Sequence, residues 1–584
     1  MEYLVIAILG VVVVALTTAV APRTKVAGPL LLVAVGIVVS LFPFVPPFEV
    51  DPELILVGVL PPLLYSAAVS LPAIEFRRDF GPIAGLSVLL VLFSSVALGF
   101  FFNALIPGLG IYFALALGAI LSPTDAVATS IVRRLGVSRR VVTMLEGESL
   151  LNDATSLVIL RVAVAIAITG QTPQGGILGT FVWGILVAIV IGALVGWLNL
   201  RLRALVHNPA ANTAIGFVVP FIAYLPTERL GGSGLVAAVV AGIVTGQGAA
   251  RWFTPEQRMS DALNWRTIEL LLEGAVFLLM GLELKELLRQ NLEDDQGLGR
   301  ALWLAVAAFA IIMVVRAAYV SFLVWLQSRR ARHRDRGRLE SFSERIESIA
   351  AEPPDPDAPR RGLAGRDLPP QQPEQRERWL SIMRSRATRA LADIDYYQGS
   401  PLGWKHGTII VWAGMRGVVT LAAAQTLPVD APERPLLVFV AFLVAVGSLM
   451  VQGLTLPWVV RRLGIDDTAA DEVSRSEQTR LDDELREAAA SALAADSLTK
   501  RDGTAFAAEL IERIAVRAAE PPDEEMTAMM HDSLELRLAM IETQRRRLTE
   551  LSSGGAYSTA VLRRALAELD ADQLSLELRL GDDD

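Results

Sequence analysis

A group of acidic, amide and hydroxyl residues lies inside an apolar stretch, residues 142–168, that is long enough to cross a lipid bilayer. The members of this group are Glu148, Ser149, Asn152, Asp153 and Ser156. A charged side chain at the bilayer centre costs about 2.5 to 3.5 kcal/mol on insertion scales, so such residues are rare and usually face a bundle interior or a water path. These residue types therefore predict ion or proton chemistry inside a membrane.

The spacing of these residues sorts them into two faces of one helix. At about 100° per residue, Ser149, Asp153 and Ser156 share one face. Glu148 and Asn152 are four residues apart and lie on a neighbouring face. Two polar faces imply two separate roles.

Two roles are open for Asp153. It is either a structural carboxylate paired with an intramembrane arginine (Arg161, Arg316 or Arg416) or part of an ion path. We favour the ion path, because intramembrane acids usually mark such paths. Burial disfavours the charged form of a carboxylate, so a proton and a cation compete for it. That competition is the basis of exchange.

Oxygen ligands for a cation are available near Asp153. A hard cation such as Na⁺ prefers oxygen, by extension from the preference of hard cations generally. The hydroxyls of Ser149 and Ser156 and the backbone carbonyl of Thr124 can supply it. We therefore predict a cation site built from these residues and Asp153.

Two apolar segments are interrupted near their middles. Residues 109–132 contain Ser122-Pro123-Thr124-Asp125, and residues 405–428 contain glycines on both sides of Arg416. Proline removes a backbone donor and disfavours helix in the residue before it, so we expect broken helices that face a cavity. The interrupted spans are seven apart in our count, so the second is inverted relative to the first, which is typical of secondary transporters.

These sequences resemble a known family. Gly-Glu-Ser-Leu-Leu-Asn-Asp-Ala at 147–154 resembles the Asn-Asp motif of the sodium/proton antiporter and sodium/hydrogen exchanger family, in the branch with NhaP-type bacterial transporters. Ser122-Pro123-Thr124-Asp125-Ala126-Val127-Ala128 and Gly414-Met415-Arg416-Gly417 accompany it. The resemblance covers roughly residues 1–465. It implies an all-α fold of two inverted six-helix repeats, with broken helices that cross in a core domain.

The resemblance also implies roles for individual residues. Positions matching Asp153, Ser149, Asn152 and Thr124 form the family's cation site, and the family pairs the glutamate and arginine matching Glu148 and Arg316. Some members carry a further glutamate in the third span, where this chain has Pro61, Pro62 and Tyr65.

Other intramembrane charges have roles that the residues suggest less directly. Asp125 either caps a half-helix or polarises the cation site through water, and both readings stay open. Arg416 is expected to neutralise the carbonyl ends of the crossing half-helices. For Arg161, Glu269 and Glu273 we expect structural pairing, with partners that the sequence does not identify.

Composition sets the class of protein. Of 584 residues, 53% are hydrophobic and the mean hydropathy is +0.46, which is typical of a polytopic membrane protein. The absence of cysteine excludes disulfides, thiolate metal sites and cysteine catalysis, and four histidines leave little for a metal cluster. We expect no cofactor beyond the transported ions. The first apolar run is read as a retained helix, because Glu2 replaces the basic start of a signal peptide.

Apolar runs of about 20 residues predict thirteen membrane spans. They lie near 3–20, 28–45, 53–71, 82–105, 109–132, 142–168, 177–200, 211–226, 233–248, 261–283, 300–327, 405–428 and 434–459. Alternate short loops contain twelve and five Lys and Arg residues. The positive-inside rule therefore predicts an outside N-terminus and a cytoplasmic C-terminus.

Two polar regions interrupt or follow the apolar body. Spans 1–11 occupy residues 1–327 and spans 12–13 occupy 405–465, separated by a cytoplasmic insert at 328–404 that is expected to be partly disordered, with a helix from about 375 to 397. Residues 466–584 are read as a small cytoplasmic helical domain. This tail has a net charge of −14 and the rest has +5, so nucleic acid is not expected as a partner.

We expect an antiporter that works as a homodimer in the cytoplasmic membrane and exchanges Na⁺, Li⁺ or K⁺ for H⁺ for pH and sodium homeostasis. A monovalent cation channel is the alternative, although a channel would need a symmetric pore with rings of carbonyls or acids. An intramembrane enzyme fits worst, because no Ser/His pairing or zinc-type His motif occurs in the spans. Since Asn152 takes up no proton near neutral pH, Asp153 alone predicts electroneutral one-for-one exchange.

Overall fold

The structure is a computed structural model. It describes residues 2–24, 26–43, 45, 51–171, 176–206, 208–293, 298–332 and 402–464. Within the insert it describes 344, 346, 348, 360–361, 367–368, 378–384, 386–387, 393 and 396–397. In the tail it describes 480–481, 483–493, 498, 500, 504–507, 510–511, 524–553 and 559–580. The chain divides into two compact units, Met1–Ala470 and Asp471–Asp584.

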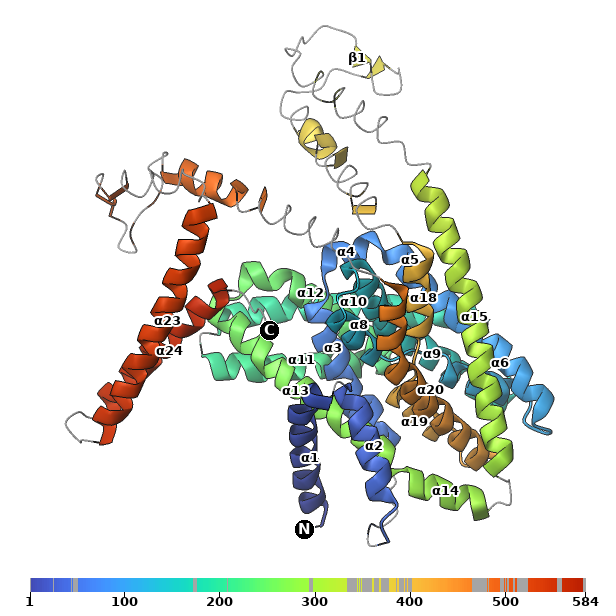
Figure 1. The fold of residues 1–584 in the computed structure, drawn as a ribbon. Coiled ribbons are helices and arrows are strands. Elements are labelled where there is room, and N and C mark those ends of the chain that lie inside the picture. The colour runs from blue at the N-terminus through green and yellow to red at the C-terminus, as the bar shows by residue number, and fades with distance from the viewer. Residues whose placement is uncertain are drawn as a thin grey trace. The chain divides into compact units, whose positions relative to one another are not determined.

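Among its described residues the first unit is helical, apart from a two-residue antiparallel pair in the insert, β1 (Arg360–Arg361) with β2 (Asp367–Leu368) (Figure 1). Its first helices are α1 (Glu2–Thr24), α2 (Gly28–Ser40), η1 (Leu54–Val59), α3 (Leu60–Ser70), α4 (Ala73–Arg78), α5 (Phe80–Ala84), η2 (Gly85–Leu90), α6 (Val91–Leu105), α7 (Ile111–Leu121), α8 (Val127–Arg134) and α9 (Arg139–Thr169). The later ones are α10 (Gly176–Leu205), α11 (Pro209–Arg229), α12 (Gly234–Trp252), α13 (Pro255–Leu282), α14 (Leu284–Glu293), α15 (Leu298–Arg332), α18 (Trp404–Trp412), α19 (Val418–Gln425) and α20 (Arg434–Leu463).

Each of the thirteen segments predicted as spans contains helix. Seven helical stretches among the described residues are long and apolar enough to cross a membrane: 80–105, 139–169, 179–205, 209–229, 234–252, 298–329 and 434–463. The others are shorter or interrupted, and α13 contains several charged residues, including Glu269 and Glu273. The count of thirteen crossings and the inverted repeat stay predictions.

Proline and glycine explain where helices change or stop. Pro61 and Pro62 lack backbone N–H groups at the start of α3, directly after the π-helical turn η1. Helix α7 ends before Pro123, and α9 ends at Gly170, which has a left-handed φ of 67°. The interruptions predicted in residues 109–132 and 405–428 are both present, because α7 stops before α8 and α18 stops before α19.

The helices of the first unit pack as two groups. In one group α3 packs on α12, α12 on α10, and α13 on α2. In the other α7 packs on α6 and α9, and α15 packs on α18 and α20. Helix α9 is central to the second group, and its Glu148, Asn152 and Asp153 are all buried.

The tail unit contains α23 (Glu524–Ser553) and α24 (Thr559–Leu580), which pack against each other. Arg545 on α23 forms an ion pair with Asp570 on α24. The middle of the insert, which was predicted to be disordered, lies mostly outside the described residues. Of the helix predicted near 375–397, the described residues 378–384, 386–387, 393 and 396–397 are helical.

Candidate ion-binding site

The two helix breaks touch each other. The backbone N–H of Asp125, after α7, donates a 2.8 Å hydrogen bond to the carbonyl of Met415, after α18. Gly417 is needed at this contact, because a Cβ there would collide with the Asp125 carboxylate. Segments almost 300 residues apart in the chain therefore meet where their helices stop.

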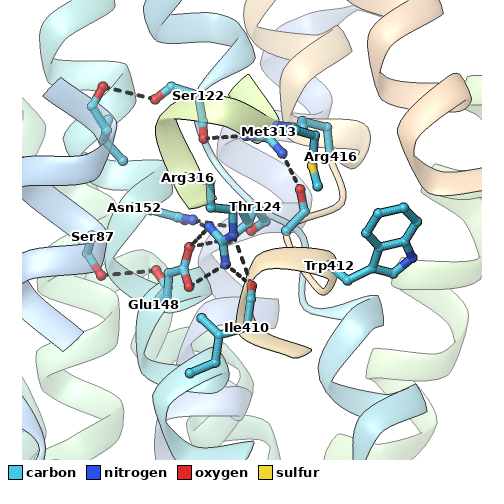
Figure 2. A network of polar contacts seen from close by, with 12 residues as sticks. Ser87, Ser122, Thr124, Glu148, Asn152, Met313, Arg316, Ile410, Trp412 and Arg416 are labelled. Carbon is cyan, nitrogen blue, oxygen red and sulfur yellow. Dashed lines mark hydrogen bonds and ion pairs between the residues drawn. The ribbon is translucent and has the colours of Figure 1, made fainter. Parts of the chain in front are cut away.

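Arg416 lies at this crossing and is almost fully buried. Its guanidinium Nε donates to the carbonyl of Leu121 at 3.1 Å. Its Nη2 donates to the carbonyl of Ser122 at 3.5 Å (Figure 2). Its Nη1 donates to the carbonyl of Gly414. These carbonyls belong to helix ends, where the helix dipole is negative, so the positive guanidinium stabilises both breaks.

Asp125 has two contacts of different kinds. Its Oδ1 accepts the backbone N–H of Val127 at 3.0 Å, which caps the start of α8. The same side chain lines the central cavity. Asp125 therefore both caps α8 and lines the cavity.

Glu148 on α9 forms a two-bond ion pair with Arg316 on α15, and each side chain is 1% exposed. Arg316 Nη2 lies 2.9 Å from Glu148 Oε2, and Nη1 donates to Oε1 (Figure 2). The arginine also donates from Nε to the carbonyl of Ile410 at 3.0 Å, at the break-proximal half of α18. A buried pair satisfied in this way is costly to disrupt, because removal of one partner leaves an uncompensated charge.

Hydrogen bonds of Asn152 and Thr124 connect the Glu148–Arg316 pair to the break between α7 and α8. The hydroxyl of Thr124 donates to Glu148 Oε1 at 3.1 Å. Asn152 Nδ2 donates to the Thr124 hydroxyl at 2.7 Å and approaches its carbonyl at 3.4 Å. Asn152 therefore orients Thr124 from behind and is not part of the cavity lining.

A cavity of about 320 Å³ lies between the two helix groups. Its walls come from η1, α3 and α13 on one side and from α8, α9, α19 and the first break on the other. Among its polar lining residues are Thr124, Asp125, Thr129, Ser149, Asp153, Glu269, Glu273 and Thr420. The cavity lining is thus rich in oxygen atoms, the ligand type that hard cations prefer.

Asp153 is 7% exposed and lines this cavity. Within the described ranges of the chain, its carboxylate makes no hydrogen bond and no ion pair. The like charge of Asp125 acts on it. A buried carboxylate without a partner binds a proton or a cation to remove the cost of its charge.

The structure brings some predicted ligands together and leaves others apart. Thr124, Asp125, Ser149 and Asp153 share the cavity, whereas Ser156 is buried away from it, and its hydroxyl has no hydrogen-bond partner in the described part of the chain. Ser156 is one turn further along α9 than Asp153, beyond the end of the cavity wall.

Structural pairing of Glu269 and Glu273 stays a prediction, and no ion pair with a described residue is present for either. Both line the cavity from α13, one helical turn apart, and Glu269 has a side-chain hydrogen bond with Ser66. Their spacing of four residues on a charged, membrane-length segment was the available sequence signal. For Arg161 the expectation of pairing holds, because it bonds Glu228 on α11 at 2.5 Å, although the arginine is 54% exposed.

Tyr65, which occupies the region of the family's additional glutamate, faces away from the cavity. Its hydroxyl accepts from Asn199 Nδ2 at 3.3 Å, and its ring packs 5.3 Å from that of Trp265. The cavity wall at α3 is apolar instead and includes Leu60, Leu63 and Leu64. The group that contains α3 and α13 therefore contributes its carboxylates from α13 rather than α3.

Comparison with known proteins agrees with this geometry. The family model described as "Sodium/hydrogen exchanger, transmembrane" matches residues 9–341 and 381–462. The uncharacterized Na⁺/H⁺ exchanger YjcE of Escherichia coli is 30% identical over 93% of this chain and 92% of its own length. The Na⁺/H⁺ antiporter ApNhaP of Aphanothece halophytica is 26% identical over 77% of this chain and 72% of its own.

A solved structure supports the fold. The sodium proton antiporter MjNhaP1 from Methanocaldococcus jannaschii superposes with a TM-score of 0.54 at 17% identity, over 80% of this chain and all of that one. At that identity the likeness concerns the fold alone.

Proposed function

Because the chain belongs to the sodium/hydrogen exchanger family, we propose that it is a secondary antiporter that exchanges Na⁺, or Li⁺ or K⁺, for H⁺. The family is one of transporters, and the apolar helices agree with a multi-pass membrane protein. The observation that carries the proposal is the Asp153 carboxylate, buried at the cavity without a hydrogen bond or ion pair from any described residue.

In the proposed cycle a proton and a cation compete for Asp153. The carboxylate is unfavourable as a bare charge in this place, so it is neutralised either by a bound proton or by a bound cation. When a cation binds, the Ser149 hydroxyl and the Thr124 carbonyl add oxygen ligands. Only loaded forms are favourable, which couples the two fluxes.

The neighbouring network serves this site by holding it in place. Asn152 fixes the position of Thr124 through its amide, and the pair of Glu148 and Arg316 fixes α9 against α15 and α18. Arg416 supports both helix breaks through their carbonyls. Asp125 adds negative charge to the cavity and so attracts cations.

Exchange in this scheme is one for one and electroneutral. A single exchanging carboxylate carries either H⁺ or Na⁺, and both loaded forms have the same net charge. Asn152 contributes no second proton, because an amide does not titrate near neutral pH.

The same proposal includes features of the whole molecule. We place the N-terminus outside and the C-terminus in the cytoplasm, from the distribution of Lys and Arg among the loops. We expect a homodimer in the cytoplasmic membrane that serves pH and sodium homeostasis. The channel alternative receives no support from the relatives, since ApNhaP is named an antiporter.

Reconstitution tests the proposal. In proteoliposomes loaded with a pH-sensitive dye, an inward Na⁺ gradient should drive proton exit. When a potassium ionophore sets the membrane voltage to different values, the rate of proton exit should not change. Na⁺ flux without coupled proton movement would indicate a channel and overturn the proposal. A rate that follows the imposed voltage would overturn only the electroneutral stoichiometry, and parallel runs with Li⁺ and K⁺ would define the ion preference.

A further inference from the structure

A second buried polar cluster lies at the first turn of α9, far from the cavity. Arg140 and Asp79 are both buried there. Arg140 Nε and Nη2 bond the Asp79 carboxylate at 3.0 and 2.8 Å, and Nη2 also donates to Gln327 Oε1 at 2.9 Å. The arginine therefore joins α9 to the corner between α4 and α5 and to the end of α15.

The last part of the insert returns to this cluster. The Tyr396 hydroxyl donates to Asp79 Oδ2 at 2.9 Å, and the Tyr397 hydroxyl donates to the carbonyl of Arg78 at 2.6 Å. Asp393 accepts a 2.7 Å bond from Arg78 Nε. These contacts join positions more than 300 residues apart in the chain.

The tyrosine rings add contacts of another kind. The Arg78 guanidinium lies 5.0 Å from the centre of the Tyr396 ring, and that of Arg140 lies 4.8 Å from the centre of the Tyr397 ring. Cation–π contacts of this type are attractive, and they are strongest at desolvated sites. The ion pair of Arg78 with Asp393 is partly exposed, and such pairs contribute little. The tyrosines therefore supply most of the attachment.

Burial, followed by the charge of Asp79, raises the pKa of Tyr396 above its ordinary value. Glu75 acts in the same direction, and Arg140 acts against it. The protonated hydroxyl is the form that donates to Asp79, and it persists below the raised pKa. The contact is thus present throughout the neutral pH range and is not a pH switch.

We propose that Asp393, Tyr396 and Tyr397 form a latch that fastens the insert to the start of α9 and so positions the helix that carries Ser149 and Asp153. Helix α9 is continuous from Arg139 to Thr169, so a shift at Arg140 is transmitted along it. At 1.5 Å per residue, Asp153 lies about 20 Å further along the axis. The insert leaves from α15 and returns at α18, so it joins the elements that hold Arg316 and its acceptor Ile410.

Crosslinking tests the docking without reference to transport. The chain contains no cysteine, so Arg78→Cys with Asp393→Cys replaces the partly exposed ion pair by one reactive pair and keeps the contacts of Tyr396 and Tyr397 with Asp79, Arg140 and the backbone carbonyl of residue 78. A short bis-maleimide should join the pair in intact membranes, and Tyr396→Ala with Tyr397→Ala should lower the yield at least fivefold. Absence of the crosslink, or an equal yield after the tyrosines are removed, would overturn the latch.

Transport tests its effect on α9. Tyr396→Ala with Tyr397→Ala should lower the maximal rate of Na⁺-driven proton movement at least fivefold, with the half-saturating Na⁺ concentration within twofold. The double change to Phe keeps the rings and should give an intermediate rate. Ser381→Ala is the matched control, because that exposed insert hydroxyl bonds only a neighbouring carbonyl of its own turn. A normal rate in the double Ala variant would overturn the positioning role, whereas an inactive wild type would contradict the proposed function and leave the crosslinking result standing.

Discussion

Two carboxylates on α9, Glu148 and Asp153, are buried to a similar degree but have opposite surroundings. Glu148 has Arg316 and the Thr124 hydroxyl as partners, whereas Asp153 faces a cavity with no hydrogen bond or ion pair from the described residues. Five residues at about 100° each place them some 140° apart around the helix. One carboxylate is thereby bonded to an arginine, and the other faces the cavity without a partner among the described residues.

The largest effect is expected from loss of the Asp153 carboxylate, which lies on the cavity-facing side of α9. Asp153→Asn removes the titratable group and should reduce Na⁺-driven proton movement in proteoliposomes to the background of empty vesicles. The variant should still insert and purify, because no described partner of Asp153 loses a bond. Ser156→Ala, which alters a hydroxyl away from the cavity, is the control and should transport at a near-normal rate. Near-normal transport by Asp153→Asn would remove Asp153 from the mechanism.

On the paired face, the expected effect is on stability. Glu148→Ala or Arg316→Ala should each lower the free energy of unfolding by about 3 to 5 kcal/mol, because each leaves a buried charge unpaired. The double variant should lose less than the sum of the two single losses. Thermal unfolding in detergent measures this, and strictly additive losses would show that the pair is not an energetic unit.

A smaller effect is expected from the opposite cavity wall. Glu273→Gln keeps the shape of the side chain and removes a carboxylate that attracts Na⁺ when it is ionised, so the half-saturating Na⁺ concentration measured at alkaline pH should rise about fivefold, equivalent to about 1 kcal/mol of attraction. The maximal rate should change little. Glu228→Gln, on α11 and away from the cavity lining, is the matched control. Complete loss of exchange in Glu273→Gln would instead make Glu273 an obligatory carrier and contradict the single-carboxylate scheme.

The smallest effect is expected from the tail. Truncation after Asp466 removes the acidic second unit and should leave exchange competent, with a change confined to its pH dependence or to oligomer stability. The pH profile of Na⁺-driven proton movement, compared with the full chain, measures this. A correctly inserted truncated protein without any exchange would show that the tail is part of the transport machinery.

The sequence predicts some of this arrangement for physical reasons. Proline and glycine disrupt helices locally, so the two breaks are readable from the chain, and polar residues at helical spacing reveal two faces of α9. It does not predict which face of α13 borders the cavity. That rotation depends on the packing of α13 against α2, which the sequence of α13 alone does not specify.

The sequence likewise does not identify ion-pair partners that lie far apart along the chain. Glu228 is 67 residues from Arg161 and on another helix, so spacing alone offers no link between them. Ser156 has the right angular position on α9, but the cavity ends before its turn, and only the packed helices define that limit. The sequence thus predicts on which side of α9 a residue lies, but it does not predict how far along the helix the cavity extends.

Proton release on cation binding tests the central claim most directly. NaCl added to purified protein in weak buffer should displace about one proton per chain, because one exchanging carboxylate binds either H⁺ or Na⁺. The release should disappear in Asp153→Asn and persist in Ser156→Ala. Equal proton release from Asp153→Asn and the wild type would contradict competition at Asp153.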